Sequence, residues 1–277
     1  MSNKSDIEKP GDDAEQVDLD CLLWENLAEI PPPQRGVAIR QRLMSKIARS
    51  AADNANFLTV RGNRGAWSRL RPGVRYKPLW NGSEGNSMLL ELAPGAGLPI
   101  HRHRWIEEGI VLDGGLQMGD LDLGPGDYHL SPAGSRHGRI ASRQGALAFL
   151  RGTSLGDTGG ALKELLGGLL PHAGGAPLTV YGRDESGWEE LAPGVRTKPL
   201  WSDGTRRSYF CCLDPGAELE GHAHAIDEEC MMLSGDIFLG DLLLRAGDYH
   251  LAPAGTRHGP ISSDTGALLF VRGQVTP

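Results

Sequence analysis

One long internal repeat constrains this chain more than any other feature of its sequence. Trp67 to Gly152 aligns with Trp188 to Gly273 at a constant offset of 121 residues, with no insertion or deletion between the two copies. Repeats that stack into solenoids or propellers are roughly 20–50 residues long, so a repeat of this length indicates a duplicated domain. The 277 residues have room for two domains of about 100–150 residues each. The sequence therefore predicts two copies of one fold.

The repeated segments are typical of β-structure. Within each copy, short apolar runs such as Ser87–Leu92 and Glu108–Leu112 alternate with turn residues, which is the pattern of strands and hairpins. The pairs Gly119-Asp120 and Gly240-Asp241 lie between two such runs and predict tight turns. The 39 glycines and 18 prolines are dispersed along the chain, as expected where turns are frequent. We expect an all-β protein of two antiparallel barrels or jelly rolls.

Helices are predicted only outside the repeats. Apolar periodicity favours helices at Asp20–Ile30 and Gln34–Arg49, separated by prolines 31–33, and a connecting helix at Gly160–Leu170 that ends before Pro171. The leucines of the connecting helix are expected to pack on a barrel, and residues 1–18 are expected to be disordered. The predicted organisation is an N-terminal tail and helical segment (1–56), a first barrel (57–152), a linker helix (153–176) and a second barrel (177–277).

Charge and composition argue against several functions. The formal net charge is −7, and the chain has no block of lysine and arginine that could follow a nucleic-acid backbone. No apolar run approaches the length of about eighteen residues that a membrane span needs. The N-terminus lacks the pattern of a secretion signal, and the four cysteines show no paired spacing: Cys21, Cys211, Cys212 and Cys230. We expect a cytoplasmic protein that contacts neither nucleic acid nor membrane.

Histidines carry the clearest chemical signal. Eight of the nine fall inside the repeats, at the same four positions of each copy. His101 and His103 are two residues apart on a predicted strand, so both side chains point to one face, and Glu107 and His137 complete a candidate ligand set. The second copy repeats this set with His222, His224, Glu228 and His258. Three imidazoles and one carboxylate suit a divalent transition ion; we expect zinc first, with iron, manganese or nickel as alternatives.

Neighbouring residues leave alternatives open. Glu108 and Glu229 would replace the assigned carboxylates as ligands if the strand register shifted by one residue. His129 and His250 either hydrogen-bond to the site from a neighbouring strand or face solvent. Cys230 shares a strand face with the carboxylate of the second copy, where it is either a small buried hydrophobic residue or a redox-sensitive thiol.

These motifs resemble those of the cupin family, whose signatures are G-x5-H-x-H-x3-E-x6-G and G-x5-P-x-G-x2-H. Gly95–Gly114 and Gly216–Gly235 fit the first signature, and Gly126–His137 and Gly247–His258 fit the second. The Trp…Pro-Gly-Val-Arg…Lys-Pro-Leu-Trp opening and the Gly-Asp-Tyr-His strand are more narrowly similar to the ChrR-type cupin domain of an anti-sigma factor. The resemblance implies two tandem double-stranded β-helix (jelly-roll) barrels, a bicupin, with zinc as the metal.

The resemblance also implies a function. A ChrR-like module senses or regulates, binding a small ligand at its metal and a sigma factor or another protein partner through the N-terminal helices. This chain lacks the His-x3-Cys-x2-Cys zinc motif of the family's anti-sigma domain, because no histidine precedes His101 and Cys21 is alone. The alternative is a metal-dependent dioxygenase or a related small-molecule oxidoreductase, so we assign no catalytic residue. Two barrels in one chain suggest a fused dimer, and a further homodimer stays open.

Overall fold

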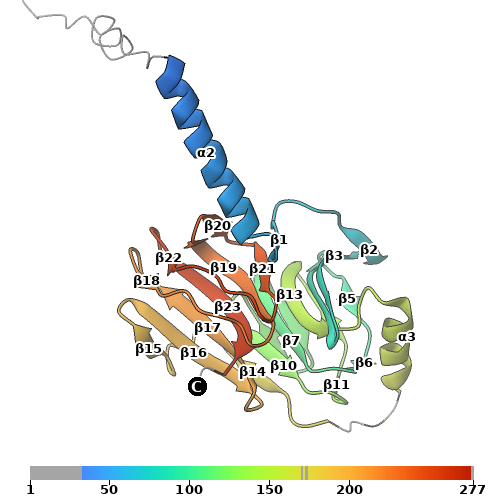
Figure 1. Ribbon diagram of the computed structural model, residues 1–277. Coiled ribbons are helices and arrows are strands. Elements are labelled where there is room, and N and C mark those ends of the chain that lie inside the picture. Colours follow the sequence, from blue (N-terminus) through green and yellow to red (C-terminus); the bar gives the residue numbers. More distant parts are fainter. Residues whose placement is uncertain (1–32, 170, 172–173, 276–277) are drawn as a thin grey trace, which may run out of the picture. The chain divides into compact units, whose positions relative to one another are not determined.

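The chain divides into two compact units, Met1–Ala52 and Asp53–Pro277. The computed structural model describes residues 33–169, 171 and 174–275 (Figure 1). The predicted tail at 1–18, the predicted helix at Asp20–Ile30 and Cys21 lie outside the described residues. Within the described part, no helix combines the length and the apolar character that crossing a membrane requires.

Helix α2 (Pro33–Asp53) is the described element of the N-terminal segment. It begins at the last of three prolines, as predicted, because a proline in the first helical turn loses no hydrogen bond. It continues past the predicted end at Arg49, through two alanines that favour helix. Leu43, Met44 and Ile47 share one side of the helix, whereas Arg42 and Arg49 lie away from that side. This helix is therefore amphipathic with a basic polar face.

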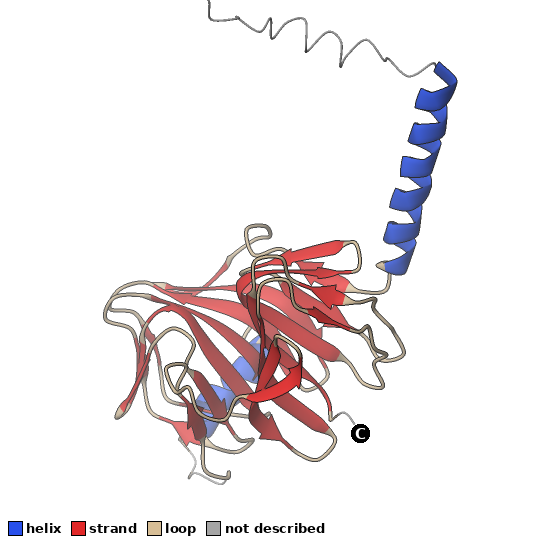
Figure 2. Ribbon diagram, turned by 90° about the vertical axis from the view of Figure 1, so that its left-hand side faces the viewer, coloured by secondary structure: helices blue, strands red, loops and turns tan. Residues whose placement is uncertain are grey.

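Residues 57–275 consist mainly of antiparallel strands, which confirms the all-β prediction (Figure 2). The strands of the first half are β1 (Leu58–Val60), β2 (Ser68–Arg71), β3 (Val74–Gly82), β4 (Gly85–Leu92), β5 (Gly97–Leu98), β6 (His101–Arg102), β7 (Glu107–Gly114), β8 (Leu116–Met118), β9 (Leu121–Leu123), β10 (Tyr128–Ser131), β11 (Arg136–His137), β12 (Ile140–Ala141) and β13 (Ala146–Thr153). Those of the second half are β14 (Leu178–Val180), β15 (Glu189–Ala192), β16 (Val195–Ser202), β17 (Arg206–Leu213), β18 (Glu218–Leu219), β19 (Glu228–Leu239), β20 (Leu242–Arg245), β21 (Tyr249–Ala252), β22 (Ile261–Ser262) and β23 (Ala267–Gln274).

Two large sheets have matching strand orders. One runs β14-β10-β7-β13-β4-β3-β2 and the other β1-β21-β19-β23-β17-β16-β15. Strand β1 lies at the start of the predicted first barrel but pairs with β21 of the second, and β14 lies at the start of the predicted second barrel but pairs with β10 of the first. Shorter strands form smaller sheets, such as β5-β12-β8-β9 in the first half. Two tandem jelly-roll barrels are thus confirmed, and each completes the main sheet of the other.

Strands β1 and β14, called here the exchanged strands, each pair with the other barrel. An aspartate of the barrel that receives the strand anchors each of them. The Gly182 N–H donates to Asp127 Oδ1 at 2.7 Å, and the Gly62 N–H donates to Asp248 Oδ1 at 2.8 Å. A Cβ on either glycine would lie only 2.6–2.7 Å from the backbone of the facing loop. Glycine is therefore required where the exchanged segment meets the other barrel.

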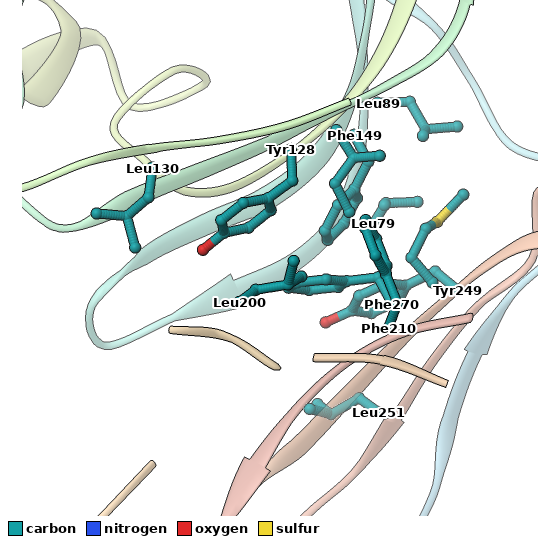
Figure 3. Close-up of a cluster of buried hydrophobic side chains, with 12 residues drawn as sticks. Leu79, Leu89, Tyr128, Leu130, Phe149, Leu200, Phe210, Tyr249, Leu251 and Phe270 are labelled. Carbon is teal, nitrogen blue, oxygen red and sulfur yellow. The ribbon is translucent and has the colours of Figure 1, made fainter. Parts of the chain in front are cut away.

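A hydrophobic core lies between the two barrels (Figure 3). Its buried residues form pairs that are related by the offset of the repeat: Leu79 and Leu200, Leu89 and Phe210, Ile110 and Met231, Tyr128 and Tyr249, Leu130 and Leu251, Phe149 and Phe270. The ring centroids of Phe149 and Phe270 are 5.7 Å apart. Because equivalent residues of the two halves share one interface, the barrels pack like the subunits of a two-fold dimer.

Two buried ion pairs cross this interface. Arg272 Nη1 of the second half donates to Glu108 Oε2 at 2.6 Å, and Arg151 Nε of the first half donates to Glu229 Oε1 at 3.0 Å. A buried tyrosine of the same barrel donates its hydroxyl to each glutamate. Each glutamate follows a candidate ligand by one residue, so strand alternation directs it into the interface. The structure therefore excludes Glu108 and Glu229 as alternatives to the assigned metal ligands.

Helix α3 (Thr158–Gly167) connects the two halves and packs on β6. It ends before the predicted Leu170, where Gly167 and Gly168 disfavour helix. The prediction that its leucines pack on a barrel is wrong for Leu166 and Leu169, which are 58% and 83% exposed. Glu164 is buried instead, and its Oε1 accepts a hydrogen bond from the Arg104 N–H. The helix thus directs a carboxylate, rather than these leucines, toward the first barrel.

Candidate metal centres

The second barrel brings all four of its predicted ligands together. His222 and His224 flank a residue whose backbone forms a β-bridge with Arg257, so both imidazoles project to one side, and His258 follows Arg257 directly. Glu228 opens β19. Each of the four candidate ligands places one donor atom within 4.8 Å of the donor atoms of the others.

Glu228 lies close to all three histidines. Its Oε1 is 3.6 Å from His222 Nε2, 3.8 Å from His224 Nδ1 and 4.0 Å from His258 Nε2. Two atoms that each lie about 2.0–2.2 Å from one ion are at most about 4.4 Å apart. These distances therefore fit a single ion shared by the carboxylate and the imidazoles.

Backbone carbonyls orient a histidine in each barrel. His258 Nδ1 lies 2.9 Å from the Gly259 carbonyl, and His101 Nδ1 lies 2.9 Å from the Pro99 carbonyl. A carbonyl only accepts, so Nδ1 holds the proton and donates it in both contacts. The lone pair is then on Nε2, and a neutral imidazole in this form is a metal ligand.

Burial keeps most of these imidazoles uncharged. It lowers the pKa values of His224 and His258, and it lowers the pKa of His103 in the first barrel to about 3. His222 differs, because its hydrogen bond with Glu228 raises its pKa. Burial alone would raise the pKa of Glu228, but that hydrogen bond and the neighbouring histidines lower it. An ionised carboxylate among neutral imidazoles is the protonation state that binds a divalent ion.

The chemistry of the donor set supports the fit to a metal. The donor set is three imidazoles and one carboxylate, which are the ligands that divalent transition ions take from proteins. The residues present therefore fit such an ion.

The first barrel brings together three of its four predicted ligands. His101, His103 and Glu107 place donor atoms within 4.8 Å of one another, and His103 Nδ1 is 3.7 Å from Glu107 Oε1. The fourth, His137, lies on β11, where its backbone pairs with that of His101 on β6. The structure describes the backbone of His137 but not its side chain. Metal ligation by the eight residues of both barrels stays a prediction.

His129 and His250 are buried beside the two groups, 7% and 3% exposed, so neither faces solvent. His129 Nδ1 is 2.9 Å from Thr179 Oγ1, and His250 Nδ1 is 3.0 Å from Thr59 Oγ1. Both threonines lie on the exchanged strands, β14 and β1. A histidine beside each candidate centre is therefore oriented by the other half of the chain.

A small cavity lies inside the first barrel, next to its candidate centre. Its volume is about 40 Å³, and His101, Glu107 and His129 line it together with apolar side chains. At about 30 Å³ for each group of the size of a water molecule, the cavity can hold about one water or the head group of a ligand. Gly109 and Ala148 are among its lining residues and leave much of this space.

The second barrel carries larger residues at the two equivalent positions. Cys230 stands where the first barrel has Gly109, Leu269 stands where it has Ala148, and both belong to the core inside the second barrel. Burial raises the pKa of the Cys230 thiol well above its usual value. Its burial in this core, at 9% exposed, favours the role of a small hydrophobic residue over that of a redox-sensitive thiol.

Acidification is expected to destabilise the metal-free chain through His103 and His250. Burial and neighbouring histidines hold their folded-state pKa values at about 3 and about 4, below the ordinary value near 6.5, so the unfolded chain binds protons more readily. The stability that depends on these two histidines being uncharged is fully present above pH ~6.5. It is lost as the pH falls from there toward their folded-state pKa values. Between pH 6.5 and 5, the free energy of unfolding should fall by about 2 kcal/mol for each histidine. Urea unfolding of chelator-treated protein at pH 7 and pH 5 measures this loss, and equal stability at both values contradicts it.

A family model described as the ChrR cupin-like domain matches the chain twice, at residues 56–155 and 179–276. Both candidate ligand sets fall within these matches. A comparison with curated proteins returns no match.

Solved structures share the fold at low sequence identity. A protein from Nostoc punctiforme that is assigned as a dioxygenase is 17% identical, covers 78% of this chain and 82% of its own, and has a TM-score of 0.59. AerE from Microcystis aeruginosa is 18% identical over 80% of this chain and 100% of its own, with a TM-score of 0.55. An oxalate decarboxylase from Bacillus subtilis is 19% identical over 78% of this chain and 77% of its own, with a TM-score of 0.54. These similarities concern the fold.

Proposed function

Because the chain belongs to the ChrR cupin-like domain family, we propose that it is a cytoplasmic metal-binding bicupin that senses a small ligand and regulates a protein partner. Each barrel holds one divalent ion, zinc in the first place, through its three histidines and its glutamate. Binding of the ligand at the ion changes the affinity of the N-terminal helices for the partner. A sigma factor is the partner that the family suggests.

The convergence of His222, His224, Glu228 and His258 carries this proposal. The bound ion would supply positive charge that attracts an oxygen atom of the ligand. The chain itself orients the donors, since the Gly259 carbonyl keeps the proton of His258 on Nδ1. The similar oxalate decarboxylase of Bacillus subtilis has Mn(II) centres, which supports divalent-ion binding by a barrel of this kind.

Elemental analysis by mass spectrometry, on protein purified without added metal, tests this function. The proposal predicts about one zinc ion for each barrel, bound by four protein ligands. Protein that is fully folded but free of transition metals would refute it. The same measurement on single-site histidine variants assigns the ions to the barrels.

A metal-dependent dioxygenase or a related oxidoreductase is the second candidate. The cavity beside His101 and Glu107 favours it, because an oxygenase needs space next to its ion for substrate and O₂. The similar structure from Nostoc punctiforme is itself assigned as a dioxygenase. Iron or manganese with bound water would favour this candidate, whereas zinc with four protein ligands and no open position weighs against oxygenase chemistry.

Deletion of residues 1–50 is expected to abolish capture of the partner and to leave metal binding intact. Considered by itself, α2 leaves Val37, Leu43, Met44 and Ile47 between 53% and 56% exposed. An amphipathic helix with an uncovered apolar side is suited to dock in the groove of a partner. Affinity capture with the full chain and with the deleted chain measures the first effect, and metal analysis measures the second. Retained capture by the deleted chain would refute the role of these helices.

A further inference from the structure

An apolar pocket, called here the vestibule, lies at the mouth of the first barrel. Its volume is about 290 Å³, and it is lined by Leu70, Arg71, Leu98, Pro99, His101, Leu155 and Glu164. Leu70 comes from β2, Leu98 from β5 and Glu164 from α3, so elements that are distant in sequence build it. Aliphatic side chains form most of its wall.

The vestibule adjoins the candidate metal centre. Leu98, His101 and Leu155 line both the vestibule and the inner cavity, and that cavity also reaches Glu107 and His129. A molecule that occupies the vestibule therefore has the candidate metal-ligating residues of the first barrel at its inner end. A pocket with an apolar wall and a few convergent polar groups is the usual form of a small-molecule site.

The mouth of the second barrel has a different chemistry. Glu220 stands there at the position of Pro99, and Leu191 stands at the position of Leu70 and is 50% exposed. Charged residues share the lining of the depression at this mouth with apolar ones: Glu218, Glu220 and Arg257 line it together with Leu219 and Pro260. The apolar vestibule is thus a property of the first barrel that the repeat does not dictate.

We propose that the vestibule binds the apolar chain of a small amphipathic carboxylate whose carboxylate group reaches the metal centre of His101, His103 and Glu107. This inference rests on the proposed metal binding, because the ion supplies the positive charge. A divalent ion with one glutamate leaves a net charge near +1, which an oxyanion neutralises.

The backbone engages the buried carboxylate of Glu164, because its Oε1 accepts the Arg104 N–H at 3.2 Å. Arg71 lines the vestibule as well and brings a positive charge.

The volume sets the length of the ligand. The vestibule is close to the lower end of the range of about 300–1,000 Å³ for small-molecule sites. At about 30 Å³ for each group of the size of a water molecule, it holds an apolar body of roughly ten carbon atoms. An eight-carbon chain such as that of octanoate therefore fits, with its carboxylate in the inner cavity.

Calorimetric titration of the metal-loaded full chain with acetate, butyrate, hexanoate and octanoate tests the inference. The affinity is expected to rise roughly fourfold with each methylene group that enters the vestibule. Octylammonium has the same chain with a cationic head, and it is expected to bind far more weakly than octanoate. Equal affinities for acetate and octanoate, or tighter binding of octylammonium, would overturn the inference.

Leu70→Asp and Leu191→Asp form a matched pair of variants at equivalent positions of the repeat. Leu70→Asp is expected to weaken octanoate binding at least tenfold and to leave acetate binding unchanged, whereas Leu191→Asp should change neither. Leu155→Asp, on another wall, replaces the first variant should that one fail to fold. Equal effects of the Leu70 and Leu191 substitutions would contradict a ligand site in the vestibule.

Metal analysis of the same samples separates the two proposals. Folded protein without metal refutes the proposed function. Metal-loaded protein whose affinity is the same along the carboxylate series refutes the vestibule alone. A dimer in sedimentation that Leu70→Asp dissociates would show that a second copy of the chain covers the vestibule, and this would also overturn the inference.

Discussion

Substitution of His224 by alanine is expected to remove the ion from the second barrel while the first barrel keeps its own. His224 is 3% exposed, and its ring centroid is 4.9 Å from that of His258, so it lies within the buried part of the donor set. Losing a group that only orients a ligand costs about 10–100-fold in metal affinity, and losing a ligand should cost more than about a hundredfold. Mass spectrometry should then find about half of the metal content of the unmodified chain.

Arg257→Ala is the matched control for this variant. Arg257 is the sequence neighbour of His258, but its guanidinium is exposed and approaches the Gly221 carbonyl at 3.5 Å instead of the candidate centre. This substitution should leave the full metal content. His103→Ala should produce the reciprocal loss, from the first barrel only. A His224→Ala chain that keeps its full metal content with unchanged affinity would exclude His224 as a ligand.

Replacement of Arg151 by methionine is expected to destabilise the folded chain by about 3–5 kcal/mol. Arg151 is 7% exposed and Glu229 is 2% exposed, and the pair lies in the interface between the barrels. Removing one partner of a buried ion pair leaves the other charge buried without compensation, which is the costly case. The free energy of unfolding from urea titrations followed by tryptophan fluorescence measures the effect.

Two further variants identify the cause of this loss. Arg75→Met breaks the exposed pair between Arg75 and Glu91, whose Nη2 and Oε2 atoms are 2.7 Å apart, and it should cost only about 0–1 kcal/mol. Arg151→Met combined with Glu229→Gln removes the uncompensated charge and should restore part of the stability. If Arg151→Met costs no more than Arg75→Met, the buried pair does not hold the barrels together.

The candidate centre of the second barrel could be predicted because its geometry is local. Two histidines at i and i+2 on an extended segment must point to one side, and Glu228 follows within one short turn. The glycines and the proline before His258 predict the hairpin that returns this residue to the same place. The constant register of the repeat then transfers the interpretation to the first barrel. These relations depend on few dihedral angles, so the sequence alone specifies them.

The exchanged strands could not be predicted in the same way. Leu58-Thr59-Val60 and Leu178-Thr179-Val180 are identical in sequence, so strand propensity does not distinguish pairing within a barrel from pairing across barrels. The choice depends on contacts between distant segments, such as the Gly182 N–H with Asp127. The burial of Glu164 was missed for a similar reason, since helical periodicity favours burial of leucines and does not include the backbone N–H of Arg104.

Anomalous diffraction from crystals of the native protein, at the absorption edge of the element found by mass spectrometry, tests the central claim most directly. The account predicts one strong peak in each barrel, and in the second barrel that peak lies about 2.0–2.2 Å from donor atoms of His222, His224, Glu228 and His258. A map without a peak in either barrel, from folded protein with those four side chains turned away from one another, would contradict it.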